Sequence, residues 1–143
     1  MDDHHAIAAV LGDYFKGLYT GDTALLRTVF HPDAALFAER GGESYHKHLD
    51  DYLDGVAARP SPAALGEPYR MKVLAIDVTH DIAVARVHVP ALGFNYVNYL
   101  SFVRRAGRWV IVNKVFADMP VADMPVADVP VADVPVADVP VAD

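Results

Sequence analysis

The chain has 143 residues, a formal charge of −7, no cysteine and 53% hydrophobic residues, which is sufficient for one domain with its own core. The lack of cysteine excludes disulfides, a thiol nucleophile and thiolate metal sites. No run reaches the roughly 18 apolar residues of a membrane span and no basic, then apolar leader is evident. We therefore expect a cytoplasmic protein with no membrane partner.

The acidity is concentrated at the C-terminal end. Residues 1–116 hold all 12 Lys and Arg and 13 of the 19 Asp and Glu, whereas residues 117–143 hold six Asp and no cation. A nearly neutral body lacks the broad basic surface that nucleic acid requires. The only basic cluster, Arg104, Arg105 and Arg108, falls at a predicted tight turn, so we expect no nucleic-acid partner.

Three helices are predicted in the first half of the chain. Apolar residues recur at three- and four-residue spacing over 3–19, which predicts an amphipathic helix ended by Gly21. Asp22 is the predicted N-cap of a short second helix. A strand over 34–39 and a glycine pair precede a third helix, predicted over 44–58.

The second half is predicted to be almost entirely strand. Runs rich in β-branched and aromatic residues alternate with turn residues, and the predicted strands cover 71–78, 82–89, 94–103 and 109–116. Three helices followed by such a meander indicate an α+β fold. We expect three N-terminal helices packed on a strongly curved, mostly antiparallel sheet, with residues 1–116 as the domain.

The last two strands acquire a register if Ala106 and Gly107 form a two-residue turn. Counting back from that turn pairs Phe102 with Ile111 and places Lys114 on the opposite face. Because side chains alternate along strands, one face then carries a mostly apolar set: Phe94, Tyr96, Asn98, Leu100, Phe102, Trp109, Ile111, Asn113 and Val115. Both faces are too apolar for solvent, so we expect one to meet the helices and the other a second subunit, as a homodimer through sheet faces.

Several strings in the chain carry a family resemblance. They are Tyr14-Phe15 through Gly21-Asp22, FHPDA at 30–34, AIDVTHDIAVARV at 75–87 and VNYLSFVRRAGRWVIVNKVF at 97–116. Together they resemble the putative lumazine-binding family of the nuclear transport factor 2-like superfamily, over nearly all of residues 4–116. The resemblance implies a conical fold in which a bent sheet and three helices enclose a pocket, commonly in a dimer packed through sheet faces.

Two departures from related patterns weaken the case for catalysis. Family members commonly have Asp where this chain has Asn98, and an amide cannot serve as a base. Ketosteroid isomerases of the same superfamily carry a Tyr oxyanion donor in a setting that resembles Tyr14, but the position of their general base falls on Ala38. The resemblance thus implies a donor without a base, and we favour Tyr14 as a core or pocket-lining tyrosine with a hydrogen-bonded hydroxyl.

The histidines offer few sites. His31 and Asp33 flank a proline, which brings the imidazole and the carboxylate close together. The pair is either a general base near the pocket mouth, with Asp33 orienting His31, or a local arrangement in which Asp33 caps backbone amides and His31 packs behind the second helix. His46 and His48, at a predicted helix start, point apart and predict a solvated pair, with no metal site. Arg86 and His88 share one strand face, which binds an anionic ligand if it is internal and belongs to the surface or a subunit contact if it is external.

The leading hypothesis is a dimeric domain that binds a small apolar or aromatic molecule without cofactor or metal. The predicted ligand-binding residues are Tyr14, Tyr96, Asn98, Phe102, Trp109 and Asn113. The alternative is a cofactor-independent dehydratase, cyclase or isomerase for an aromatic or polycyclic substrate, using His31, Asp33 and Tyr14 as catalytic residues. A third hypothesis is an interaction module whose cavity is filled by its own side chains.

The end of the chain is a repeat. From Met119 a five-residue unit, Met/Val-Pro-Val-Ala-Asp, occurs five times up to Asp143. Each proline removes a backbone donor and each aspartate adds like-charge repulsion, which opposes helix and sheet. Residues 117–143 are predicted to form an extended tail, with a pentapeptide β-solenoid as the competing interpretation.

Overall fold

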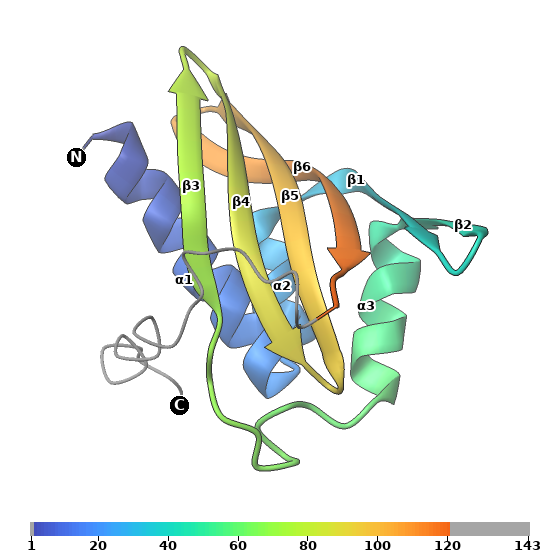
Figure 1. The fold of residues 1–143 in the computed structure, drawn as a ribbon. Helices are drawn as coiled ribbons and strands as arrows, with labels where there is room; N and C mark the ends of the chain where they lie inside the picture. The colour runs from blue at the N-terminus through green and yellow to red at the C-terminus, as the bar shows by residue number, and fades with distance from the viewer. Residues whose placement is uncertain (1, 121–143) are drawn as a thin grey trace.

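The computed structural model describes residues 2–120 (Figure 1). Three helices and six strands follow one another in the order α1 (Asp3–Thr20), α2 (Thr23–Val29), β1 (Phe30–Arg40), β2 (Glu43–His48), α3 (Leu49–Ala58), β3 (Lys72–Thr79), β4 (Ile82–Ala91), β5 (Phe94–Arg105) and β6 (Arg108–Asp118). The predicted α+β class is confirmed.

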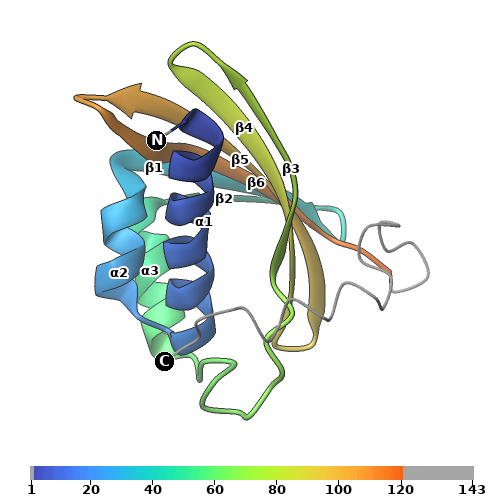
Figure 2. The ribbon, with the colours of Figure 1, turned by 90° about the vertical axis from the view of Figure 1, so that its left-hand side faces the viewer.

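The strands form one sheet in the order β2-β1-β6-β5-β4-β3. All neighbours are antiparallel except β1 and β6, which run parallel. The three helices pack together on the concave side of the bent sheet, and no helix of the described residues lies on the other face (Figure 2). A sheet that curves around helices leaves room for a cavity where the two layers diverge.

The first two helices are bounded by the residues that the sequence predicts, Gly21 at the end of α1 and Asp22 at the start of α2. The Asp2 side chain accepts a hydrogen bond from the His5 backbone at the start of α1, and Gly21 ends that helix with a φ of 73°. Asp22 caps α2 by accepting from the Leu25 backbone.

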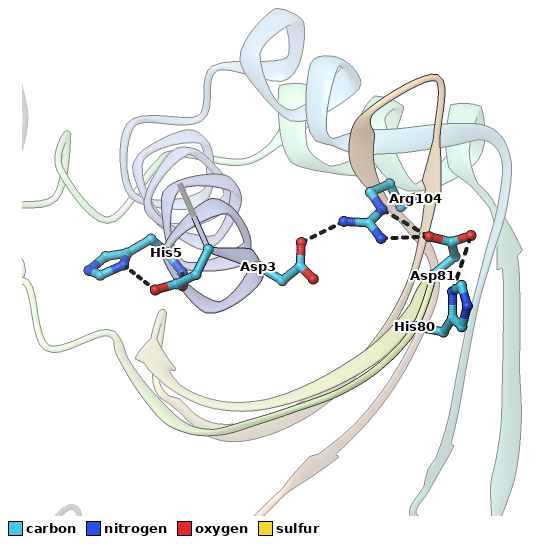
Figure 3. A network of polar contacts seen from close by, with 6 residues as sticks. Asp3, His5, His80, Asp81 and Arg104 are labelled. Carbon is cyan, nitrogen blue, oxygen red and sulfur yellow. Dashed lines mark hydrogen bonds and ion pairs between the residues drawn. The ribbon is translucent and has the colours of Figure 1, made fainter.

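The N-terminus of α1 is tied to the sheet by Arg104. Its guanidinium donates to Asp3 at 2.6 Å and to Asp81, in the turn between β3 and β4, at 2.7 Å (Figure 3). These hydrogen bonds hold the pKa of Asp81 below its ordinary value. The other two arginines of the basic cluster also make contacts within the domain: Arg105 contacts His31, and Arg108 donates to the Thr28 carbonyl oxygen. All three arginines therefore hold parts of the fold together.

The third helix is shorter than predicted. Residues 43–48 form strand β2, antiparallel to β1, and α3 begins only at Leu49. Gly41 and Gly42 both have positive φ, at 56° and 84°, and form the two-residue turn between β1 and β2. A glycine pair is a strong hairpin signal, and the prediction of helix over 44–48 is wrong because it treated that pair only as a break.

The turn of the last hairpin is the one predicted. Ala106 and Gly107 have φ of 51° and 77°, and Arg105 pairs with Arg108. Positive φ at both turn positions gives the twist that antiparallel strands prefer. An alanine adopts this conformation here, although glycine or asparagine would do so with less strain.

The predicted register holds only as far as Ile111. Phe102 pairs with Ile111, but the next pairs are Ser101 with Asn113 and Leu100 with Lys114. Val112 is thus an extra residue in β6, a β-bulge, and every later side chain of the strand changes face. Lys114 and Phe116 are buried on the concave face, while Val115 is exposed. The placement of Asn113 and Val115 on the face of Asn98 was wrong, since counting in register assumes no bulge.

Within residues 2–120, no helix combines the length and apolar character needed to cross a membrane. The cytoplasmic location stays a prediction. The predicted domain boundary falls close to the end of β6 at Asp118, and the tail from residue 121 onward lies outside the described residues.

Candidate functional site

The concave face and the helices enclose a cavity of about 140 Å³. It lies at the end of the molecule where α1 and α3 finish and where β4 turns into β5. Its walls are mainly aromatic and aliphatic, with three cationic side chains and one amide. The lining residues with polar or charged side-chain groups include Arg40, Tyr52, Arg59, Tyr96, Asn98 and Lys114.

Lys114 is the most unusual residue of this lining. The bulge in β6 turns its side chain inward, and only 6% of the residue is exposed. Nζ donates a hydrogen bond to the Tyr52 hydroxyl at 3.2 Å and lies 4.8 Å, 5.1 Å and 5.6 Å from the ring centres of Tyr52, Phe116 and Tyr14. No carboxylate within residues 2–120 forms an ion pair with it. The amine is held by π faces and one hydroxyl.

This environment changes the protonation of the amine. Burial lowers the pKa of Lys114 from 10.5 to about 7, and the nearby positive charge of Arg59 adds to the effect. Tyr14 and Tyr52 stay neutral, because burial raises the pKa of each hydroxyl above its ordinary value. Close to neutral pH, a substantial fraction of Lys114 is therefore an uncharged amine, which has a lone pair.

Asn98 supplies the second polar group on the cavity wall. Its amide nitrogen donates to the Tyr14 hydroxyl at 2.8 Å, joining β5 to α1. Only 1% of the residue is exposed, and its amide oxygen is buried without a hydrogen-bond partner. Leaving a buried acceptor unpaired is costly. Asn98 is thus prepared to accept a hydrogen bond from a ligand.

Two arginines lie at the mouth of the cavity. The Arg40 guanidinium packs 5.5 Å from the Phe94 ring centre and 5.8 Å from that of Tyr45. Arg59 follows the last residue of α3 and lines the cavity from the other layer. Neither guanidinium is ion-paired with a carboxylate within residues 2–120. The mouth is therefore positively charged.

The structure brings part of the predicted ligand-binding set together. Tyr96 and Asn98 line the cavity, and Tyr14 contacts both Asn98 and Lys114 behind it. Phe102, Trp109 and Asn113 do not line it. Phe102 is a core residue, Trp109 is buried beneath the Arg104 guanidinium at 5.1 Å, and the bulge directs Asn113 away.

The predicted catalytic trio is not assembled. His31 accepts a hydrogen bond from the Asp33 backbone at 3.0 Å and contacts Arg105, at the far end of β5 from Phe94. Neither His31 nor Asp33 lines the cavity that Tyr14 adjoins. The contact within the pair is local, but it is the His31 ring that accepts from the Asp33 backbone, whereas the sequence had offered the Asp33 side chain as the capping group.

The remaining histidines also lie outside the cavity. His46 stacks on Phe37 at 4.4 Å and lies beside His48 on β2. Ala85 and Val87 point into the core, so Arg86 and His88 belong to the outer sheet face. There His88 is buried and hydrogen-bonds to the side chain of Asn95. The internal alternative for Arg86 and His88 is excluded.

Sequence reasoning missed the cationic part of the site. Lys114 was assigned to the other face because the bulge was not foreseen, and Tyr52, Arg40 and Arg59 stood in elements with no recognised motif. One signal was present in β6: Phe116, a large apolar residue, favours the face that it shares with Lys114 over the face of Asn113.

Comparison with known families agrees with this architecture. A family model described as putative lumazine-binding matches residues 2–117. The chain belongs to that family. A relative in the same size range is the protein named aldolase FrzH of a Cladobotryum species, which is 26% identical over 121 residues, covering 82% of this chain and 93% of that protein.

Solved structures support the fold. An NTF2-like protein of unknown function from Silicibacter pomeroyi superposes with a TM-score of 0.74 at 22% identity, covering 81% of this chain and 95% of that one. A similar protein from Shewanella baltica gives 0.71 at 23%, covering 82% and 94%. The CaMKII hub of S. rosetta gives 0.61 at 18%, covering 83% and 98%. At these identities the likeness concerns the fold alone.

The burial of Lys114 predicts a pH-dependent cost in stability. Because its pKa is lowered on folding, the unfolded chain binds more protons between pH 7 and 10.5, so stability rises with pH over that interval. Lys114→Met removes the charge and keeps the length of the side chain. We expect the variant to be more stable than the wild type by roughly 3–5 kcal/mol at pH 6, with the difference shrinking as pH rises toward 10.5.

Urea unfolding of both proteins across this pH range measures the difference directly. The charged and titratable groups facing Lys114 are Tyr14 of α1 together with Tyr52 and Arg59 at α3, and all are present in both proteins. A stability difference that does not change between pH 6 and 10 would show that Lys114 is not held in this environment.

Proposed function

We propose that this protein binds a small molecule, with one aromatic or similarly flat ring and an acidic group, in the cavity between the helices and the sheet. The observation that carries the proposal is the pairing of two buried polar groups within a mostly apolar wall: the Asn98 amide oxygen, which has no hydrogen-bond partner, and the Lys114 amine, which has one hydroxyl partner and no carboxylate within residues 2–120. Binding sites of this kind are mostly apolar with a few placed polar groups.

The volume limits the size of the ligand. A cavity of about 140 Å³ is close to the roughly 150 Å³ of an engineered apolar cavity that admits benzene. One ring therefore fits, and a larger molecule would place only its end there. This cavity is too large for the third hypothesis, in which side chains fill it completely.

The charges suggest how the ligand is oriented. Arg40 and Arg59 at the mouth can pair with a carboxylate, for which guanidinium groups are suited. A ligand hydroxyl or N–H deeper in the cavity would satisfy Asn98. The favoured ligand thus has an acid at one end and a hydrogen-bonding group at the other.

A second candidate function is catalysis on a carbonyl compound. The specific observation is Lys114, an amine with a pKa of about 7 that lines the cavity; the relative named aldolase FrzH supports it at 26% identity. This candidate replaces the trio of His31, Asp33 and Tyr14 with a different reactive group. The dehydratase, cyclase or isomerase alternatives have no base from that trio in the cavity lining.

The proposed assembly is a homodimer through the outer sheet face. That face exposes large apolar side chains, with Ile82 58%, Tyr99 52% and Val115 45% accessible. A monomer gains nothing from this exposure.

Binding is tested with para-hydroxybenzoate, which has a carboxylate and a hydroxyl at opposite ends of one ring, and with benzoate, which lacks the hydroxyl. We expect calorimetric titration to show para-hydroxybenzoate binding about five- to tenfold tighter than benzoate, because its hydroxyl satisfies Asn98. Asn98→Leu should remove this preference. Arg59→Gln should weaken both acids.

The matched control is Arg27→Gln, which alters an exposed arginine paired with Asp50 on the helical side and should leave both affinities unchanged. Equal affinity of the wild type for the two acids, or equal loss in the Arg27 and Arg59 variants, would contradict the proposed orientation. Absence of binding by either acid would contradict the ligand class.

The dimer is tested by placing a charge in the proposed interface. Tyr99→Glu should convert a dimer into a monomer in size-exclusion chromatography with light scattering, since burying an unpaired carboxylate is costly. Leu65→Glu, at an exposed apolar residue outside the sheet, is the control and should leave the dimer intact. A wild-type protein that elutes as a monomer at every concentration would exclude the assembly.

A further inference from the structure

Lys114 has the surroundings of a nucleophile as well as those of a binding group. Lys114 lines the cavity, and its Nζ lies 4.8 Å and 5.1 Å from the ring centres of Tyr52 and Phe116, which line the same cavity, so the amine is close to any molecule bound there. Tyr14 packs 5.6 Å from Nζ on the side of α1. A carboxylate that would keep the amine protonated is lacking within residues 2–120. Desolvation next to a second cation, here Arg59, is a recognised way to activate a lysine.

We propose that the Lys114 amine forms a covalent imine with an aldehyde or ketone held in the cavity, and that the favoured substrates are small carbonyl compounds that also bear a carboxylate. The inference rests on the proposed function, because it uses the same cavity and the same acid-binding mouth. It goes further in assigning one nucleophile and one reactive group.

The reaction can be followed atom by atom. The lone pair of neutral Nζ attacks the carbonyl carbon, a C–N bond forms, and the C=O π electrons move onto oxygen. One proton leaves nitrogen as the oxygen gains one, which the Tyr52 hydroxyl can relay, since it lies 3.2 Å from Nζ. Loss of the resulting hydroxyl with a second proton from nitrogen releases water and leaves the C=N bond, so no oxidant or reductant is consumed.

Asn98 fits the intermediate of this reaction. The tetrahedral carbinolamine has an O–H group that the carbonyl compound lacks. Asn98 and Lys114 face the cavity from the adjacent strands β5 and β6. Asn98 pairs with Phe116 and Lys114 pairs with Leu100, and these are successive residue pairs on the concave face. The Asn98 amide oxygen has no hydrogen-bond partner. A hydrogen bond donated by the new hydroxyl to this oxygen would stabilise the intermediate more than the bound carbonyl compound.

Trapping by reduction tests the proposal on the full chain. The probe is para-carboxybenzaldehyde with sodium cyanoborohydride at pH 7, which converts an imine into a stable secondary amine. We expect intact mass spectrometry to show one carboxybenzyl group added, and proteolytic mapping to place it on Lys114. Benzaldehyde, which lacks the carboxylate, should label Lys114 at least severalfold more slowly, and para-hydroxybenzoate should protect it.

The pH profile separates Lys114 from ordinary lysines. Labelling of Lys114 should reach half of its maximum near pH 7, whereas a lysine with an unperturbed pKa requires a pH of about 10.4. Lys114→Met should abolish the mapped adduct and Lys16→Met should leave it. The N-terminal amine also titrates near neutrality, and mapping distinguishes its peptide.

The outcomes separate this inference from the proposed function. Binding of para-hydroxybenzoate without an adduct at Lys114 would overturn the imine and leave the binding function standing. Labelling spread evenly over the lysines would overturn it as well. Absence of both binding and adduct would remove the two proposals together. The mapping uses the wild-type chain, so it decides the question even if Lys114→Met folds poorly.

Discussion

The bulge at Val112 determines which chemistry the cavity contains. Side chains of a strand alternate between two faces, so one inserted residue exchanges every later side chain between the core and the outside. Beyond Val112, Lys114 and Phe116 face the helices, and Val115 faces outward. Without the bulge, an amide and a valine would line this wall. The outer face depends on the same residue, since the bulge adds Val115 to its exposed apolar side chains.

Burying the charged amine of Lys114 costs free energy, which aromatic rings and one hydroxyl group partly offset. Three aromatic faces and the Tyr52 hydroxyl stabilise the charged form. Desolvation acts in the opposite direction and dominates, which lowers the pKa to about 7. A side chain that destabilises the fold in this way is typical of functional sites, where stability is given up for a reactive group. The unpaired oxygen of Asn98 is a second example on the same wall.

The sequence was most informative about local rules. Helix caps at Asp22 and Gly21, and the turn at Ala106 and Gly107, follow from side-chain chemistry and backbone preference within a few residues. Tyr96 and Asn98 were placed on the cavity side because side chains alternate without a break along β5, and Tyr14 was named from the resemblance of the first helix to ketosteroid isomerases. Lys114 was missed because a bulge is selected by packing across the sheet, which a count along one strand cannot detect. Arg59 was missed because it lines the cavity only through the position of the C-terminal end of α3 against the sheet, and the sequence does not specify that position.

Lys114 is buried beside the cavity and loses its proton near neutral pH. The most direct test of this property is an NMR titration of the protein with carbon-13 at the ε position of lysine, with the Lys114 signal assigned by its absence from Lys114→Met. We expect one of the four lysine signals, that of Lys114, to titrate near pH 7. A Lys114 signal that titrates at its ordinary value of 10.5 would contradict the placement of Lys114.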